Sequence, residues 1–132
     1  MAAVASGATL VAAGALHLLW GSGSSWPLQS RSSLAVVVSG SPTMPGAVPC
    51  VVIGGGLVAA GSALVVRRPA GLLRLLQVLM ATGLAGRAAV GGRVATHALG
   101  LPAPAPVFLS WDRRCYRPLC AVLAVGILAD VR

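Results

Sequence analysis

Side chains able to bind or react gather where the long apolar segments of this sequence end. His17 and Trp20 close the first segment, three residues apart, which places them on one face of a helix. Arg87 lies near the end of the third segment, and Asp112 follows at the start of the fourth. Nine residues share an expected position at one end of the protein and form the candidate ligand-binding set: His17, Trp20, Trp26, Arg87, Arg93, Trp111, Asp112, Arg113 and Tyr116.

This set suits an anionic ligand. Guanidinium groups match the oxygens of phosphate and carboxylate, and indole rings supply a stacking surface. Basic pockets between membrane helices bind lipid headgroups. The sequence therefore predicts a site for an anionic lipid headgroup, a polyprenyl phosphate or a partner membrane protein.

Each candidate also has a plainer structural interpretation. A histidine one turn from a membrane edge, as His17 is, commonly packs and hydrogen-bonds a neighbouring helix, with proton relay, ligand binding, or metal or haem ligation as alternatives. The three tryptophans fit an interfacial aromatic belt. Arg87 is close enough to a helix end for its guanidinium to extend to the surface. Asp112 pairs with Arg87, Arg93 or His17, or only stabilises the first turn of its helix.

The residue inventory argues against an enzyme. With two acidic residues and two histidines, the chain offers neither paired carboxylates nor a convincing set of nucleophile, histidine and acid. Lysine is absent, and with it the phosphate-binding loop motif that requires one. We expect neither a metal site nor a cofactor.

Three cysteines keep one enzymatic alternative open, a membrane thiol–disulfide oxidoreductase. Cys50 would pair with Cys115 or Cys120, but the last two are five residues apart and form no C-x-x-C motif. Cysteine is also a small apolar residue that suits helix packing. A small transporter component is a further alternative, which only the size of the chain supports. The first apolar segment has no acidic residue to couple protons, and this argues against it.

The composition is that of a membrane protein. Of 132 residues, 57% are hydrophobic and 9% are charged, whereas a soluble domain carries about 25% charged residues. This contrast excludes an ordinary soluble domain, a disordered tail and a coiled coil. The net charge of +8 does not indicate nucleic-acid binding, because the arginines interrupt apolar segments instead of covering a polar surface. The lipid bilayer is the expected partner, and nucleic acid is not.

Four apolar segments are predicted to cross the bilayer as helices, at about residues 2–21, 49–66, 72–92 and 111–130. In hydrocarbon every backbone polar group must be paired, so helices are the default. The predicted fold is a single-domain, all-α integral membrane four-helix bundle.

The remaining features concern the loop, the last helix and the helix contacts. Residues 22–48 form a polar loop, within which Leu34 to Val38 is too short to cross a membrane. Ser110 is the expected N-cap of the last helix, and Pro118 is expected to bend it. Small residues predict close helix contacts at Gly7, Gly14 and Gly21, at Gly56 and Ala60, and at Gly83 and Gly91.

The arginines do not settle the orientation by number. One side of the membrane receives Arg67, Arg68, Arg74 and Arg132, and the other receives Arg31, Arg93, Arg113, Arg114 and Arg117. The short turn with Arg67 and Arg68 weighs most, so we expect a multi-pass cell-membrane protein with both termini in the cytoplasm. The excess of arginine on the other face then calls for a further role. Because four short helices enclose little interior, association into a homo-oligomer stays open.

Two motifs resemble those of a family of small bacterial membrane proteins, the domain of unknown function 3995. The first is H-x-x-W-x-x-G-x-x-W from His17 to Trp26, and the second is W-D-x-x-x-Y-x-P-L-C from Trp111 to Cys120. The resemblance implies about four spans and a membrane location, but no activity. Arg117 departs from the small residue expected at its position in the second motif.

Overall fold

The computed structural model describes residues 2–66, 71–98 and 100–131, and every regular element within these ranges is a helix. The predicted all-α class is therefore confirmed for the described residues. In chain order the elements are α1 (Ala2–Gly21), α2 (Arg31–Ser39), α3 (Ala47–Val66), α4 (Leu72–Ala98), α5 (Pro106–Trp111), the π-helical turn η1 (Asp112–Tyr116) and α6 (Arg117–Val131).

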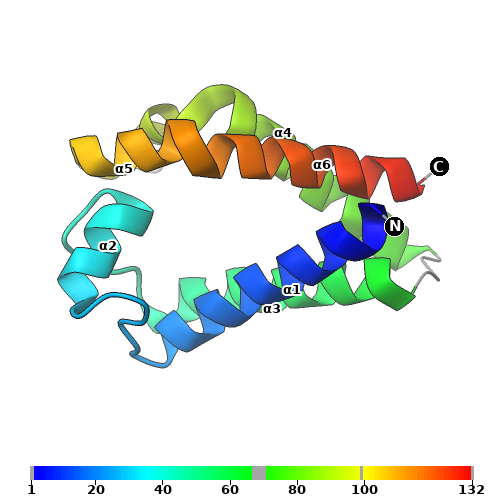
Figure 1. Ribbon diagram of the computed structural model, residues 1–132, viewed down its shortest axis with the longest axis horizontal. Coiled ribbons are helices and arrows are strands. Elements are labelled where there is room, and N and C mark those ends of the chain that lie inside the picture. The colour runs from blue at the N-terminus through cyan, green and yellow to red at the C-terminus, as the bar shows by residue number, and fades with distance from the viewer. Residues whose placement is uncertain (1, 67–70, 99, 132) are drawn as a thin grey trace.

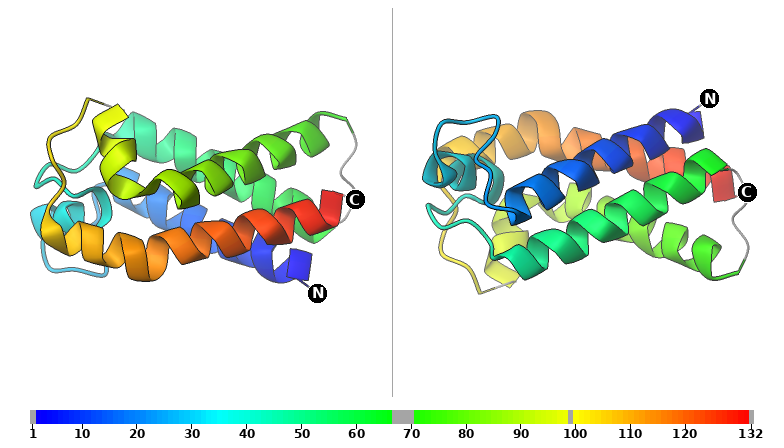
Figure 2. Two further views of the ribbon diagram at one scale, coloured as in Figure 1. Left: turned by 90° about the horizontal axis from the view of Figure 1, so that it is seen from above. Right: turned by 90° about the horizontal axis from the view of Figure 1, so that it is seen from below.

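The long helices run back and forth along one axis (Figures 1 and 2). Helix α1 packs mainly on α3, and α4 packs mainly on α6, while α1 also contacts α6 and α3 contacts α4. Helices α5, η1 and α6 follow one another without a break and form one last helix. Both chain ends lie at one end of the molecule, and α2 lies at the opposite end, called here the α2 end.

Helices α1 and α3 approach so closely that glycine is needed at facing positions. A Cβ atom built on Gly14 would lie 2.6 Å from the carbonyl oxygen of Gly54, and one on Gly7 would lie 2.7 Å from that of Gly61. Small residues join membrane helices through such backbone contacts. The prediction that glycines spaced by seven residues in α1 make close helix contacts is confirmed. The residues of α3 that they contact include Gly54 and Gly61. The contacts predicted for the pair Gly56 and Ala60 and for Gly83 are wrong at the two glycines, because a Cβ built on either would touch nothing within 4 Å.

Two adjacent glycines of α3 should respond oppositely to the same substitution. In Gly54→Ala the new methyl group would lie 2.8 Å from the carbonyl oxygen of Gly14, and we expect a loss of about 1–2 kcal/mol of unfolding free energy from overpacking. In Gly55→Ala the methyl group meets open space, and the better helix propensity of alanine should stabilise by up to about 1 kcal/mol. Unfolding in mixed micelles measures both, and equal effects would refute the close α1–α3 contact.

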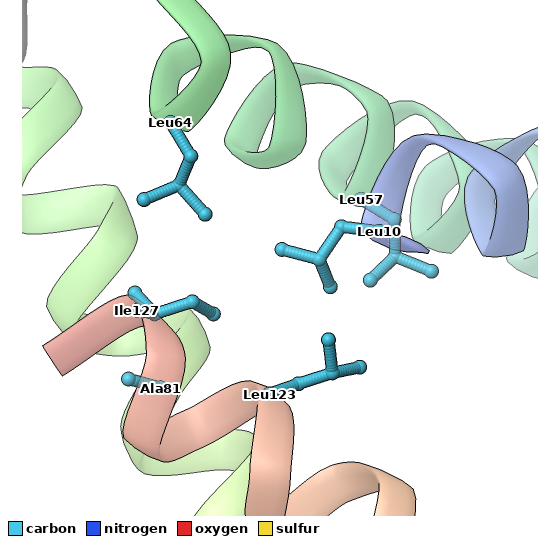
Figure 3. Packing of buried hydrophobic residues seen from close by; sticks show 6 residues of the cluster. All are labelled: Leu10, Leu57, Leu64, Ala81, Leu123 and Ile127. Atoms are coloured by element: carbon cyan, nitrogen blue, oxygen red, sulfur yellow. The ribbon is translucent and has the colours of Figure 1, made fainter. Parts of the chain in front are cut away.

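The two helix pairs meet in a core of six buried apolar side chains that point toward one another (Figure 3). All four long helices contribute to it, through Leu10, Leu57, Leu64, Ala81, Leu123 and Ile127. Gln77, one turn before Ala81, is also fully buried. Its amide has no hydrogen-bond partner within the described ranges, which makes it an exception to the pairing of buried polar groups.

Helix α2 lies inside the segment predicted to be a loop. Its N-cap is Ser30, whose hydroxyl accepts a hydrogen bond from the backbone N–H of Ser33. Gly40 ends it in the left-handed conformation, with φ of 78° and its N–H donating to the Val36 carbonyl. Such cap residues at both ends compensate for a short helix. The prediction of a loop over the whole of 22–48 is therefore wrong, because it weighed only the length needed to cross a membrane.

The predicted limits of the third and fourth spans are also corrected. Helix α4 continues to Ala98, past the expected end at residue 92, and is instead broken at Gly91. The last helix begins earlier than expected, at Pro106, so Ser110 lies inside it and is not its N-cap. Proline at a first helical position costs no hydrogen bond. The irregularity expected at Pro118 occurs one turn earlier, as the π-helical turn η1.

Within the described residues, α1, α3 and α4 are long and apolar enough to cross a membrane. Their outward faces carry large apolar side chains, such as Val52 at 67% exposure and Leu72 at 69%. The same holds for α6, where Val122 and Val125 are 67% and 68% exposed. Apolar surface this extensive is unsuited to water and suits hydrocarbon.

Candidate functional site

The site begins with a break in α4. Gly91 has φ of 75° and ψ of 173°, a conformation that only glycine adopts readily. The break interrupts the helical hydrogen-bond ladder, so carbonyl groups before it and N–H groups after it lose their partners. Unpaired backbone groups are costly away from water. Neighbouring side chains must therefore satisfy them.

Asp112 satisfies the N–H side of the break. Its side chain is nearly fully buried, and its Oδ2 accepts a hydrogen bond of 2.6 Å from the Gly92 N–H. Its Oδ1 accepts from the guanidinium of Arg87, which also forms a salt bridge with it. Both carboxylate oxygens are thus occupied by α4. Of the three partners that the sequence allowed for Asp112, the structure selects Arg87.

Arg117 satisfies the carbonyl side of the break. Its Nε donates to the Ala88 carbonyl oxygen at 2.7 Å, and an Nη donates to that of Ala89 at 3.0 Å. Guanidinium is suited to this task because its several N–H donors lie in one plane. We call the break and the side chains that satisfy it, Arg87 to Gly92 with Asp112 and Arg117, the α4 junction.

The π-helical turn explains how two residues five apart reach the same break. In this turn the Arg117 N–H donates to the Asp112 carbonyl oxygen, five residues back instead of four. Residues five apart therefore stand nearly above one another, as residues three or four apart do in an α-helix. Both side chains can then face α4, one toward each side of the break.

Two aromatic side chains hold the last helix around the α4 junction. The Phe108 ring packs over Gly92 so closely that a Cβ there would lie 2.5 Å from the ring. The hydroxyl of Tyr116 donates to the Val37 carbonyl oxygen of α2 at 3.1 Å, and the two rings are 6.1 Å apart between centroids. Tyr116 thus ties the last helix to α2 and has a structural role.

Arginines line an open cavity of about 240 Å³ beside the α4 junction. Its charged lining residues are Arg93, Asp112, Arg113 and Arg117. Asp112 and Arg117 already hydrogen-bond α4, as described above. Arg93 and Arg113 are exposed, and neither side chain has a hydrogen-bond or ion-pair partner in the part of the chain that the structure describes. The cavity is therefore a region of uncompensated positive charge.

Further cavities continue from the same two arginines. Arg93 also borders a space of about 330 Å³ with Thr96, His97 and Leu101. Arg113 borders another of about 210 Å³, together with Arg114. The positive region is thus larger than one cavity and has an apolar side next to Arg93.

The remaining candidates gather around the end of α1. The His17 and Trp20 rings contact each other at a tilt of 52°, with centroids 5.2 Å apart, and the Trp20 indole N–H donates to the Trp26 carbonyl oxygen at 2.8 Å. Arg31 donates to the Trp20 and Ser24 carbonyl oxygens and so caps the helix end. The structure therefore divides most of the predicted set into two clusters at the α2 end, one at or beside the α4 junction and one around His17. In the described part of the chain, Trp111 takes part in neither set of contacts.

The exposed tryptophans and the cysteines lie outside the α4 junction. Trp26 and Trp111 are 60% and 47% exposed, which fits the predicted aromatic belt. Cys50 is buried, Cys120 is half-buried and Cys115 is exposed. All three are free thiols in the described structure, and no disulfide forms between them.

Sequence reasoning missed Arg117 and the two glycines of the break. The sequence indicates Arg117 only as one of the arginines on one membrane side and as a departure from the family pattern, and it indicates Gly91 only as a small packing residue. One signal was present: adjacent glycines in a long apolar helix mark a position where the ladder can be interrupted. Three arginines used to judge orientation, Arg67, Arg68 and Arg132, lie outside the described residues.

Comparison with known proteins confirms the family resemblance. The family model described as "Protein of unknown function (DUF3995)" matches residues 10–127, which include both motifs and the α4 junction. No curated protein and no solved structure matches the chain.

Proposed function

We propose that this chain, which belongs to the DUF3995 family of proteins of unknown function, is a four-span membrane protein that binds an anionic lipid headgroup. The fourth span is the last helix, Pro106 to Val131, which is continuous and about 39 Å long at 1.5 Å per residue. Together with α1, α3 and α4 it makes an integral four-helix bundle. The headgroup site is the arginine-lined cavity at the α4 junction.

One observation carries the proposal: Arg93 and Arg113 flank a cavity in which the available carboxylate is already engaged. Asp112 gives both oxygens to α4, so it leaves the charge of these two arginines uncompensated. A phosphate diester offers oxygens that two guanidinium groups can bind together. The lipid source follows from the setting, because the cavity lies at the end of apolar helices and opens beside an apolar space.

Replacing Arg93 and Arg113 together with glutamine should reduce bound anionic lipid. Protein extracted from native membrane in mild detergent is analysed for co-purified phospholipid by mass spectrometry. We expect the double variant to retain at most about one tenth of the wild-type anionic lipid, since two charge-assisted contacts are worth more than 1.4 kcal/mol. Neither side chain has a hydrogen-bond or ion-pair partner among the described residues, so the unfolding midpoint of the delipidated protein should hardly change.

The matched control is Arg74→Gln, which removes an arginine at the far end of α4. This variant should retain lipid like the wild type. Equal retention in the wild type and in the Arg93→Gln/Arg113→Gln variant would refute the proposal. Equal loss in Arg74→Gln would also refute it, because net charge alone would then explain binding.

We further propose that both termini lie in the cytoplasm, which places the α2 end on the outer face. The arginines at the α2 end then oppose the positive-inside tendency, which supports a binding role for them. A membrane-impermeant maleimide added to intact cells should label the exposed Cys115. The Cys115→Ser variant supplies the background. Labelling that appears only after the cells are broken would show that Cys115 faces the cytoplasm, and that the proposed orientation is wrong.

A further inference from the structure

We infer that His17, Met44 and Cys50 form a binding site for Cu(I), distinct from the arginine-lined cavity. The three residues come from the end of α1, the segment after α2 and the start of α3. They line one cavity of about 100 Å³, beside Trp20 and Pro45. In liquid water each molecule occupies about 30 Å³, so the space suffices for one ion.

The hydrogen bond of His17 prepares its other nitrogen for a metal. Its Nδ1 lies 2.8 Å from the Ala13 carbonyl oxygen, and a carbonyl can only accept. In the neutral imidazole Nδ1 therefore carries the proton, and Nε2 has the lone pair. Metal-binding histidines have this arrangement, with one ring nitrogen donating to a carbonyl or carboxylate and the other facing the ion.

The tight contact between α1 and α3 holds Cys50 next to His17. Gly54 abuts His17, since a Cβ built on Gly54 would lie 3.1 Å from the His17 Cβ. Gly21 likewise abuts Cys50 at 3.1 Å. His17 and Gly21 are one turn apart on α1, as Cys50 and Gly54 are on α3. The two potential ligands thus lie about one turn apart on facing helices and line the same cavity.

Cys50 can provide a thiolate at little cost in existing contacts. The thiol is buried, and its one hydrogen bond runs to the Pro45 carbonyl oxygen at 3.9 Å, which is long and weak. Binding of the ion replaces the S–H bond with a sulfur–metal bond and releases one proton to solvent. No electron is transferred, because copper enters as Cu(I).

The ligand chemistry favours Cu(I) over other metals. Thiolate and thioether are soft ligands that select Cu(I), and imidazole is compatible with it. Zinc sites use thiolate, imidazole and carboxylate, but not thioether. Among the described residues there is no group of three His, Cys, Asp or Glu side chains, so the thioether of Met44 is needed for a third ligand. The sequence predicts no metal site, because its three cysteines lack the spacing of a zinc site.

A titration with Cu(I) against a chromophoric chelator, under anaerobic conditions in detergent, tests this assignment. We expect one Cu(I) per chain in the wild type and in Cys115→Ser, whose thiol is exposed and does not line the cavity. Cys50→Ser, His17→Asn and Met44→Leu should each weaken binding at least tenfold. X-ray absorption of the copper-loaded wild type should show sulfur and nitrogen neighbours.

Two further comparisons separate loss of a metal ligand from other effects of the substitutions. Met44→Leu nearly conserves volume and lies outside the helices, so it separates ligand loss from misfolding if Cys50→Ser unfolds. The Arg93→Gln/Arg113→Gln variant should bind copper like the wild type, because the two sites share no residue. Wild-type affinity in Met44→Leu and His17→Asn, or loss of binding in Cys115→Ser, would overturn the site.

Discussion

Replacing Asp112 by asparagine is expected to destabilise the protein by about 3 kcal/mol, since breaking a buried ion pair leaves one charge without a partner. Asparagine preserves the shape and one acceptor for the Gly92 N–H. It leaves the Arg87 guanidinium uncompensated, and one of its Nη atoms is already buried without a hydrogen-bond partner among the described residues. The estimate lies at the low end for buried pairs because 27% of the Arg87 side chain is exposed.

Unfolding in mixed micelles measures this loss, and a double-mutant cycle assigns it. Combining Asp112→Asn with Arg87→Met removes the uncompensated charge, so it should recover part of the loss. Arg113→Gln is the matched control, because this neighbour of Asp112 is exposed and engages no described partner; its effect should stay within about 0.5 kcal/mol. An Asp112→Asn variant as stable as Arg113→Gln would show that the ion pair does not stabilise the break in α4.

The second large loss of unfolding free energy is expected for Arg117→Met. Methionine keeps the apolar stem but removes the donors to the Ala88 and Ala89 carbonyl oxygens. A buried acceptor left unsatisfied costs about 1–3 kcal/mol. Because the bond to Ala88 is only part-buried and the bond to Ala89 is exposed, we expect a loss of about 1–2 kcal/mol of unfolding free energy. Hydrogen exchange at the amides around the break should also accelerate.

Arg114→Met is the matched control for this substitution. Arg114 is exposed on the same π-helical turn, and no described residue hydrogen-bonds its side chain. Its loss should change stability by less than about 0.5 kcal/mol. If Arg114→Met and Arg117→Met were equally stable, the carbonyl groups before the break would have to be satisfied without Arg117.

The sequence was sufficient for the helices that lie in apolar segments and for one part of the site. Long apolar runs predicted α1, α3 and the first part of α4, because bilayer thickness fixes the length that a span needs. The pairing of Asp112 with Arg87 was among the predicted options, since few acidic residues exist in the chain. Opposite charges in an apolar setting have few alternatives to pairing.

The details that the sequence did not predict depend on contacts between distant segments. Gly91 resembles any small residue of a membrane helix, and its break is stable only because Asp112 and Arg117 supply partners to both sides. These two residues face α4 together only through a π-helical turn, which apolar patterning does not indicate. The division of the polar residues into two clusters likewise follows from how helix pairs pack, with α1 on α3 and α4 on α6.

The α4 junction places irregular backbone and charge at the end of an apolar bundle. In membrane proteins, non-helical backbone is tolerated where protein or a water-filled cavity satisfies it, and such positions commonly line binding sites. Here the break, its ion pair and its capping arginine support a cavity whose remaining arginines are uncompensated. The structural part of the junction thus leaves Arg93 and Arg113 available for a ligand.

A density map of the protein purified in native lipid and embedded in a nanodisc tests this account most directly. We predict headgroup density in the cavity of about 240 Å³, in contact with the guanidinium groups of Arg93 and Arg113. The map of the Arg93→Gln/Arg113→Gln variant should lack this density while the Asp112–Arg87 pair remains in place. A wild-type cavity without lipid density, or lipid bound only elsewhere on the bundle, would contradict the account.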